Sequence, residues 1–305
     1  KEKIKILLFA KNQAEIFYEF VNQPITCRCG SECVVKLLND QWFINYGDIE
    51  WKNKVHNYID SMSIIPEELR QEFHNVVDWL KERACARKSG LGTKLPWDRE
   101  WIIESLSDSV VYMAYYTISK FVNSENHSLN QYIDEIDESF FDFIFFGVGN
   151  INDIERRCKI DKSLLEKLRK EFIYFYPVDC RHSGRDLVPN HLSFFIFNHV
   201  AIFEKKYWPK QMVINGSVLM EGKKMSKSLG NIIAIRTVIQ NYGADTIRLS
   251  ILISAELLQD ADFSFETAKS IRSKLYDLYN QALDSSYKSS VDKTFIQKLQ
   301  EFKSS

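Results

Sequence analysis

The sequence has no excess of either charge. Its 305 residues include 40 basic and 41 acidic side chains, so the formal net charge is -1. A protein that binds polyanions through its whole surface carries a clear positive excess, and this class is excluded. Any contact with nucleic acid must therefore be local. The length and the 45% apolar content allow one large domain or two to three smaller ones.

Cysteines are few and scattered. The six residues at positions 27, 29, 33, 85, 158 and 180 form no even framework, which favours a reducing compartment over a disulfide scaffold, and we expect a cytoplasmic protein. Three of them, Cys27, Cys29 and Cys33, lie within seven residues. A second ligand pair is missing and the C-x-C spacing is unusual for zinc, so we favour buried free cysteines and assign no metal site.

Long hydrophobic runs are also absent. The apolar run at residues 6–10 is too short for a signal sequence, and Asp142 interrupts the run at residues 140–148. Neither run could span a bilayer, so we expect no contact with a membrane. The chain starts at Lys1 and not at Met, which we interpret as a piece of a longer protein.

The strongest local positive charge lies in residues 205–227, where six lysines stand against one acid, Glu221. Within this segment, residues 224–228 read Lys-Met-Ser-Lys-Ser. Ammonium groups and hydroxyls at this density suit a polyphosphate, which is stabilised by point charges and short donors. The alternative is a solvated surface turn.

We favour the phosphate-binding loop because structure is predicted on both sides of it. Residues 216–220 read as a short strand that runs into a glycine turn, and an apolar segment follows at residues 232–235. A Walker A loop is excluded, since five residues instead of four separate Gly216 from Gly222, and Lys224 stands where Ser or Thr is required. The lysines therefore serve another phosphate chemistry.

Hydrophobic spacing predicts most of the remaining elements. Continuous apolar runs predict strands, and apolar residues at helical spacing predict helices. The predicted strands are residues 101–104 and 172–179; the predicted helices lie within residues 49–87, 110–122, 123–172 and 187–203, and from residue 265 onward.

Two predicted strands are each followed by a polar turn and a helix, the unit of a doubly wound sheet. Ligands in such sheets lie beyond the carboxyl ends of the strands, where we expect Ser107, Asp108 and Ser109. A plain helix N-cap needs only one of them and is the alternative. Asp186 also reads as an N-cap on sequence alone. In the helix that follows, His191 and Asn198 share an apolar face, either as hydrogen-bonded core or as ligand-binding groups.

Several of these segments match one family. Residues 224–228 match the second signature of the class I aminoacyl-tRNA synthetases, and residues 229–231 and 242–248 match its continuation. Residues 104–115 resemble the archaeal and eukaryotic type of leucyl-tRNA synthetases specifically. The resemblance implies an α/β fold: the second half of a Rossmann-like parallel sheet with helical insertions, followed by an α-helical segment. The family usually has Lys where Arg185 stands, and Ala86 stands where it has Ser.

The resemblance also implies the site residues. Lys227 and Lys224 would be catalytic, because they would neutralise charge on the triphosphate. The pocket for the amino acid would contain Ser107, Asp108 and Tyr112. The residues expected to bind ATP are Met225, Ser226, Lys227, Ser228, Gly184, Asp186 and His191.

The implied reaction activates leucine with ATP, which brings Mg2+ with it, and transfers the leucyl group to leucine tRNA. Valine or isoleucine is the alternative substrate. The implied domains are the exit of the editing insertion (1–45), the second half of the catalytic domain (46–210) with a helical insertion (about 123–172), a signature-loop region that contacts the tRNA stem (211–264) and the start of the anticodon-binding helical bundle (265–305).

One family feature is missing from the chain. The first signature, a His-x-Gly-His pair, occurs nowhere in the sequence. The chain is then either one part of a working enzyme, completed by a separate polypeptide that carries the first half of the catalytic domain, or a non-catalytic module that binds nucleotide or tRNA. We expect the isolated chain to be inactive.

Overall fold

A computed structural model describes residues 1–21, 24–27, 30–35, 37, 40–122, 129–132, 134–225, 230–256 and 258–283. The chain divides into two compact units, Lys1–Gln41 with Ser226–Ile232, and Trp42–Met225 with Ile233–Ser305. The smaller unit contains helix α1 (Glu2–Ala10), which buries no residue, and a short hairpin in which Cys27 N donates to Ser31 O.

The larger unit is built around a three-stranded parallel sheet. Its order is β2-β7-β6, with β2 at Ser63–Ile65, β7 at Gln211–Asn215 and β6 at Arg181–Gly184. Central strand β7 buries Met212 and Ile214, whose side chains point to the same face. The predicted α/β fold with a parallel sheet is confirmed.

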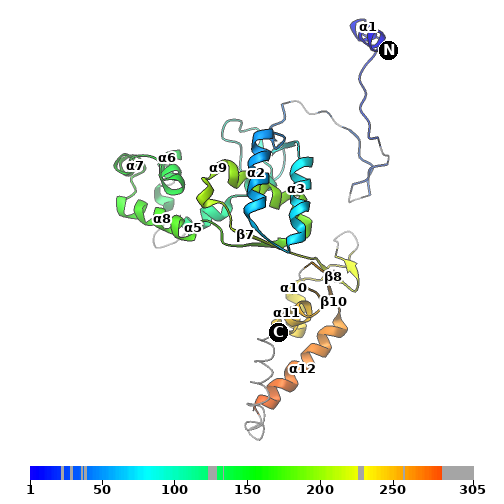
Figure 1. The fold of residues 1–305 in the computed structure, drawn as a ribbon, viewed down its shortest axis with the longest axis vertical. Coiled ribbons are helices and arrows are strands. Elements are labelled where there is room, and N and C mark those ends of the chain that lie inside the picture. The colour runs from blue at the N-terminus through cyan, green and yellow to red at the C-terminus, as the bar shows by residue number, and fades with distance from the viewer. Residues whose placement is uncertain are drawn as a thin grey trace. The chain divides into compact units, whose positions relative to one another are not determined.

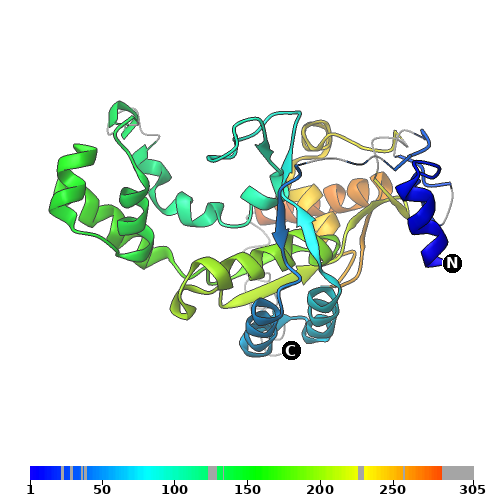
Figure 2. The same ribbon diagram turned by 90° about the horizontal axis from the view of Figure 1, so that it is seen from above.

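Helices pack against this sheet and fill the main core. They are α2 (Ile49–Ser61), the turn η1 (Glu67–Leu69), α3 (Arg70–Trp79) and α9 (Ser193–Ile202). Figures 1 and 2 show α2, α3 and α9 gathered beside β7. Asp48 caps α2 by accepting from Trp51 N, and α9 buries seven of its ten residues. The helices predicted at 49–87 and 187–203 are therefore confirmed, with the short strand β2 between α2 and α3.

The strand predicted at 172–179 is wrong. Helix α8 runs from Lys162 to Phe175, and the strand β6 starts only at Arg181. The aromatic run at the end of α8 combines two faces of one helix. Leu165, Leu168 and Phe172 recur at helical spacing and are fully buried, whereas Tyr174 is 82% exposed. A continuous apolar run in the sequence does not by itself show whether the segment is a buried strand or part of a helix.

The strand predicted at residues 101–104 is present, but it lies outside the parallel sheet. The strand β5 (Ile102–Ile103) pairs antiparallel with β4 (Ala86–Arg87), so it does not belong to the parallel sheet. The other small antiparallel pair joins β1 (Phe43–Asn45) to β3 (Glu82–Ala84). After β5 the chain forms the single turn α4 (Ser105–Asp108) and then α5 (Tyr112–Val122).

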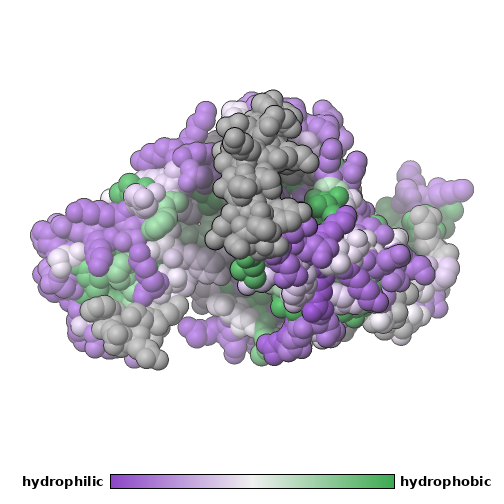
Figure 3. Space-filling view, turned by 90° about the horizontal axis from the view of Figure 1, so that it is seen from below, coloured by the Kyte–Doolittle hydropathy of each residue, from purple (hydrophilic) through white to green (hydrophobic). Residues whose placement is uncertain are grey.

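A helical segment with its own core lies between β5 and β6. It consists of α5, η2 (Leu129–Tyr132), α6 (Glu138–Phe141), the π-helical turn η3 (Asp142–Phe146), α7 (Ile151–Cys158) and α8. Fully buried Phe140, Ile144 and Phe172 pack together at its centre. Figure 3 shows one face of the molecule, where hydrophilic residues predominate and apolar patches are small.

The last part of the larger unit starts immediately after β7. Its strands β8 (Val218–Met220), β9 (Lys223–Lys224) and β10 (Ala261–Phe263) form a second three-stranded sheet, in which β10 and β8 are parallel. Three helices accompany it: α10 (Ile235–Tyr242), α11 (Ala244–Leu252) and α12 (Phe265–Leu283). Among the described residues, no helix combines the length and apolar character needed to cross a membrane.

Candidate functional site

The carboxyl end of β6 presents a glycine and a free carboxylate. β6 ends at Gly184, and the turns η4 (Arg185–Leu187) and η5 (Val188–Leu192) follow. A Cβ on Gly184 would lie 2.7 Å from Asp186 Oδ1, so the carboxylate occupies the space that a larger residue would need. Asp186 caps neither turn, because the N-cap positions are Gly184 and Leu187. Among the described residues its carboxylate makes no hydrogen bond or ion pair, so it can accept from a ligand.

A hydrogen-bonded cluster joins His191 on η5 to residues from β6 and α5. Arg181 on β6 donates from Nη2 to His191 Nε2 (3.1 Å) and from Nη1 to the Tyr112 hydroxyl (3.0 Å). Ser109 Oγ lies 3.5 Å from His191 Nδ1. The Arg181 guanidinium also lies over the Tyr112 ring, 5.9 Å from its centroid. The fold thus brings together His191 and Tyr112, which are 79 positions apart in sequence.

His191 is held as a neutral imidazole. It is buried, at 7% exposure, and burial together with the neighbouring Arg181 charge lowers its pKa below the ordinary value. Both causes disfavour the charged form. His191 therefore presents a neutral ring near neutral pH.

Of the three residues predicted for the amino-acid pocket, only Tyr112 lies in this cluster. Ser107 and Asp108 lie on α4, where Ser107 N donates to Glu104 O. Burial and the nearby Glu104 raise the pKa of Asp108. β5 is not part of the parallel sheet, so the doubly wound unit expected at residues 101–122 is wrong, whereas the assignment of Ser107 and Asp108 to the amino-acid pocket stays a prediction. Beside this cluster, where the rings of Tyr112 and Tyr116 are in contact, a hollow of about 610 Å³ is lined by residues of α5 and of the segment before β6: Met113, Tyr116, Thr117, Lys120, Phe175, Tyr176, Val178, Asp179 and Cys180.

The lysine-rich loop starts on a hairpin. β8 and β9 pair antiparallel, with Leu219 opposite Lys224, and Glu221 and Gly222 form the turn with positive φ angles of 50° and 75°. Lys224 is exposed, and Met225 packs against a small core around Met220. The strand predicted at 216–220 is confirmed as β8. The predicted ATP-binding residues Ser226, Lys227 and Ser228 lie outside the described residues.

Two aspartates fix this hairpin through backbone groups. Asp260 Oδ1 accepts from Ser217 N at 2.7 Å, and Asp262 Oδ1 accepts from Gly222 N at 2.8 Å. Gly216 allows the segment before β10 to approach, since a Cβ there would lie 2.2 Å from the Gln259 carbonyl oxygen. The main chain of the hairpin is therefore held by these two aspartate side chains, while Lys223 and Lys224 are exposed.

The remaining polar candidates have structural roles. Asn198 donates to the Tyr46 hydroxyl (3.1 Å) and to Phe194 O (2.8 Å), so it is hydrogen-bonded core. Cys27 is exposed and Cys33 is partly exposed, which contradicts the interpretation of both as buried thiols; Cys29 lies outside the described residues. In the described part of the chain, no three His, Cys, Asp or Glu residues are placed to hold a metal ion.

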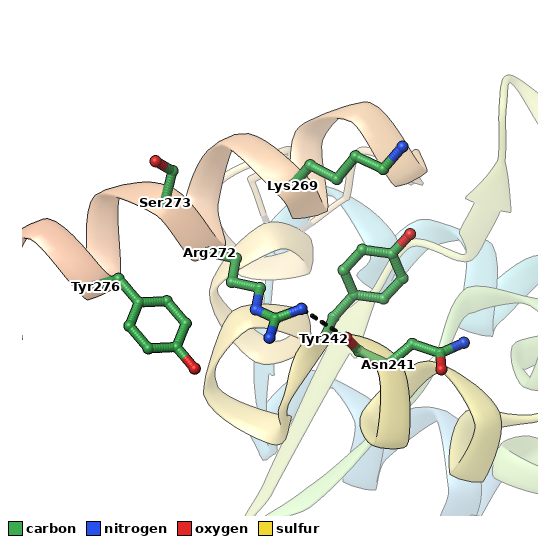
Figure 4. Close-up of a pocket in the computed structure, with 6 residues that line it drawn as sticks. All are labelled: Asn241, Tyr242, Lys269, Arg272, Ser273 and Tyr276. Atoms are coloured by element: carbon green, nitrogen blue, oxygen red, sulfur yellow. Dashed lines mark hydrogen bonds between the residues drawn. The ribbon is translucent and has the colours of Figure 1, made fainter.

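Another hollow, of about 540 Å³, opens between α10 and α12 (Figure 4). Arg272 donates from Nη1 to Asn241 O at 2.8 Å and lies 5.6 Å from the centre of the Tyr276 ring. The other lining residues are Tyr242, Lys269 and Ser273. No residue predicted for the site lines this hollow.

The sequence was compared with known families and proteins. A model of the "tRNA synthetases class I (I, L, M and V)" matches residues 14–264. The chain belongs to the class I tRNA synthetases. A leucine--tRNA ligase of Methanococcus maripaludis strain C7 is 50% identical over 295 residues, which cover 97% of this chain and 30% of that protein. The leucine--tRNA ligase of Methanocaldococcus jannaschii is 48% identical over 279 residues, 92% of this chain and 29% of that protein.

This class I synthetase chain thus spans about 30% of the length of the curated relatives it matches. Among solved structures, Mycobacterium tuberculosis methionyl-tRNA synthetase in complex with methionyl-adenylate is similar, with a TM-score of 0.49 and 19% identity, over 75% of this chain and 36% of that chain.

Sequence reasoning missed two parts of the candidate site. Arg181 was assigned to a turn, although it starts strand β6 and contacts both His191 and Tyr112. Asp260 and Asp262 were not identified, although they hold the hairpin of β8 and β9. An arginine between an aromatic run and a Ser-Gly pair was the available signal for Arg181. Nothing local indicates the aspartates, because their partners lie about 40 residues away.

Proposed function

We propose that this chain supplies the second half of the catalytic domain of a leucine–tRNA ligase. The observation that carries the proposal is the 48–50% identity to leucine--tRNA ligases across more than nine-tenths of the chain. The substrates are leucine, ATP with its Mg2+, and leucine tRNA, and the protein acts in the cytoplasm. Helix α12, which follows β10, then begins the anticodon-binding bundle.

In the first step, a carboxylate oxygen of leucine attacks the α-phosphorus of ATP. The bond from that phosphorus to the bridging oxygen breaks, which gives leucyl-adenylate and pyrophosphate. The second step transfers the leucyl group to the terminal ribose of the tRNA and releases AMP. The protein forms no covalent bond in either step, so positioning and charge stabilisation account for the catalysis.

The nucleotide is held by two groups of residues. Asp186 accepts from the ribose hydroxyls, Gly184 lets the ligand approach the backbone, and His191 flanks the adenosine. The Asp186 carboxylate, which lies just after β6 and has no hydrogen bond or ion pair to any described residue, supports this assignment. Lys224, Met225, Ser226, Lys227 and Ser228 contact the triphosphate, and the two lysines neutralise charge as pyrophosphate leaves. The exposure of Lys224 on an anchored hairpin supports this role.

The amino-acid pocket is assigned to Ser107, Asp108 and Tyr112. Tyr112 is supported by its place beside Arg181 and His191, since it adjoins the proposed adenosine site. The active site is completed by the first half of the catalytic domain, which carries the His-x-Gly-His signature absent from this sequence.

Leucine-dependent exchange of pyrophosphate into ATP tests the proposal. We expect no exchange by this chain alone and exchange when a polypeptide with the first half of the catalytic domain is added. Valine and isoleucine serve as alternative substrates in the same assay. Exchange with valine or isoleucine and none with leucine would overturn the leucine assignment. If no amino acid supported exchange in the completed protein, the chain would be a non-catalytic binding module.

A further inference from the structure

Arg181 contacts two residues of the candidate site that lie far apart in the sequence, Tyr112 and His191. One arm of its guanidinium donates to the Tyr112 hydroxyl on α5, and the other donates to His191 Nε2 on η5. A guanidinium holds its donors in one plane and at fixed angles, so it fixes both partners relative to β6. Lysine could not reproduce this geometry, because an ammonium has a single nitrogen.

The contact determines the tautomer of His191. Arginine has no acceptor and does not lose its proton in proteins. His191 Nε2 must therefore accept with its lone pair, which leaves the ring proton on Nδ1. Ser109 Oγ, at 3.5 Å, is the oxygen toward which Nδ1–H is directed. Both ring nitrogens are thus assigned a role by neighbouring residues.

Other charged groups near His191 do not oppose this arrangement. Burial and the charge of Arg181 are the two causes that lower the pKa of His191. Arg185, on the adjoining turn, is already paired with Glu72 (3.0 Å). The further titratable or charged groups on the elements packed around η5 are Arg70, His74 and Asp78 on α3, Asp186 on η4, His199 on α9, His182 on β6 and Asp108 on α4.

We propose that Arg181 is a positioning residue, which holds His191 as the neutral Nδ1–H imidazole and ties it to Tyr112. The nucleotide-binding residue and the amino-acid-pocket residue then share one rigid support. This role in catalysis rests on the proposed function, whereas the effect on His191 itself does not.

The third nitrogen of the Arg181 guanidinium, Nε, indicates which substitution the fold should tolerate. The Nε atom is buried and has no hydrogen-bond partner in the described part of the chain. An unpaired buried donor is unfavourable, so replacement by an apolar residue removes this penalty along with the two favourable bonds. We therefore expect Arg181→Met to fold. Arg181→Lys keeps the charge and loses the two-armed geometry. Arg156→Met is the matched control, since Arg156 is an exposed arginine on α7 that pairs with Asp153.

The first experiment measures His191 directly in this chain. Ring nitrogen and carbon chemical shifts, followed by NMR from pH 8 to pH 4, report both its tautomer and its titration. In the unmodified chain and in Arg156→Met we expect the Nδ1–H form and a titration midpoint below 6.5. In Arg181→Met the midpoint should rise toward 6.5, because one of its two causes is removed, and in Arg181→Lys it should stay low. An Nε2–H tautomer in the unmodified chain, or an unchanged midpoint in Arg181→Met, would overturn the proposal.

The second experiment measures ATP–pyrophosphate exchange against pH in the completed enzyme. Arg181→Met should lower kcat/KM for ATP on the order of 10²-fold, the effect of a misplaced site group, and should move the acid limb of the profile to higher pH. Arg181→Lys should restore the limb and only part of the rate. A uniform loss with an unmoved limb would mean that Arg181 has a structural role alone. If the NMR result holds but the unmodified enzyme shows no exchange, the proposed function fails and the effect on His191 stands.

Discussion

Two regions of the larger unit carry the proposed site, and they fix their functional groups in different ways. The sheet region, formed by β2, β6 and β7 with α2, α3 and α9, holds His191 through buried side-chain hydrogen bonds. The signature region, formed by β8–β10 with α10–α12, has a smaller core around Met220 and presents Lys224 in solvent. There the hydrogen bonds hold the backbone, and the lysine side chains of β9 are exposed.

The difference separates stability from activity. In the sheet region a substitution changes packing, protonation and ligand binding together, because the same buried groups serve all three. In the signature region a lysine can be replaced with little effect on the fold, since exposed side chains away from special features change stability only slightly. Substitutions in the two regions should therefore give different combinations of effects.

The largest effect on activity is expected from Lys227→Ala. Loss of one preorganised charge that stabilises the departing pyrophosphate should cost about 2 to 4 kcal/mol in the activation step. Leucine-dependent exchange in the completed enzyme measures this, and Lys223→Ala on β9, a lysine four positions earlier in the sequence, is the control. We expect the unfolding midpoint to stay unchanged in both variants. An exchange rate that equals the unmodified rate in Lys227→Ala would remove the lysine from the mechanism.

The sheet region should show a pH dependence of stability that the signature region lacks. His199 on α9 is fully buried; its Nδ1–H donates to Phe195 O (2.8 Å), and its Nε2 accepts from the Tyr176 hydroxyl (2.6 Å). Burial lowers its pKa from 6.5 to about 4. Between pH 6.5 and pH 4 the unfolded chain binds more protons at this position than the folded chain does. The contribution of neutral His199 to the free energy of unfolding is therefore fully present above pH 6.5 and is lost as the pH is lowered to 4.

A shift of this size corresponds to about 3 kcal/mol. Urea unfolding at pH 7 and at pH 4.5 measures the difference. His199→Gln, which keeps a donor and an acceptor without titrating, should lose most of it, and the lowered pKa of His191 leaves a smaller remainder of the same sign. The sequence from residue 211 onward contains no histidine, so the signature region contributes no such term. If His199→Gln keeps the full pH dependence, another group is responsible.

The two regions also differ in how far the sequence predicts them. The signature segment is predicted well, because its motif is contiguous and its strand and turn are local: β8 and the turn at Gly222 lie where the residues indicate. For the sheet region the sequence predicts the α/β fold class, but not the type of every element or the pairing of the strands. The run at 172–179 starts with the last turn of α8, in which Phe172 is buried and residues 173–175 are exposed. Strand β7 is defined by its pairing with β2 and β6.

The site follows the same rule. His191 and Tyr112 were identified by resemblance, yet their contact through Arg181 depends on the pairing of β6 and on the path of α5. Such contacts between distant segments have no local signal. The expected place of β5 in the parallel sheet failed for the same reason, since its apolar residues do not reveal which strand they pair with.

A smaller effect, confined to ligand binding, is expected from Gly184→Ala. The backbone of Gly184 has an ordinary φ of -77°, so alanine fits the conformation, but its Cβ would lie 2.7 Å from Asp186 Oδ1. The carboxylate must move away from the proposed ribose position. We expect KM for ATP to rise roughly tenfold, equivalent to about 1.4 kcal/mol, with little change in stability. An unchanged KM for ATP would show that Asp186 does not contact the nucleotide, and KM for leucine is the internal control.

The smallest effect is expected from Asp262→Ala, which removes the acceptor for Gly222 N at the turn of the signature hairpin. The lost hydrogen bond is solvent-exposed, so we expect about 1 kcal/mol in the local stability of the hairpin. Amide hydrogen exchange of residues 218–224 should become faster, while the amides of β7 keep their protection. Asp260→Ala, just before β10, is the matched variant. It removes an equivalent hydrogen bond, from Ser217 N before β8, and leaves the bond at the Gly222 turn intact. Faster exchange in β7 after Asp262→Ala would show that the two regions unfold as one, and the separation drawn between them would then be wrong.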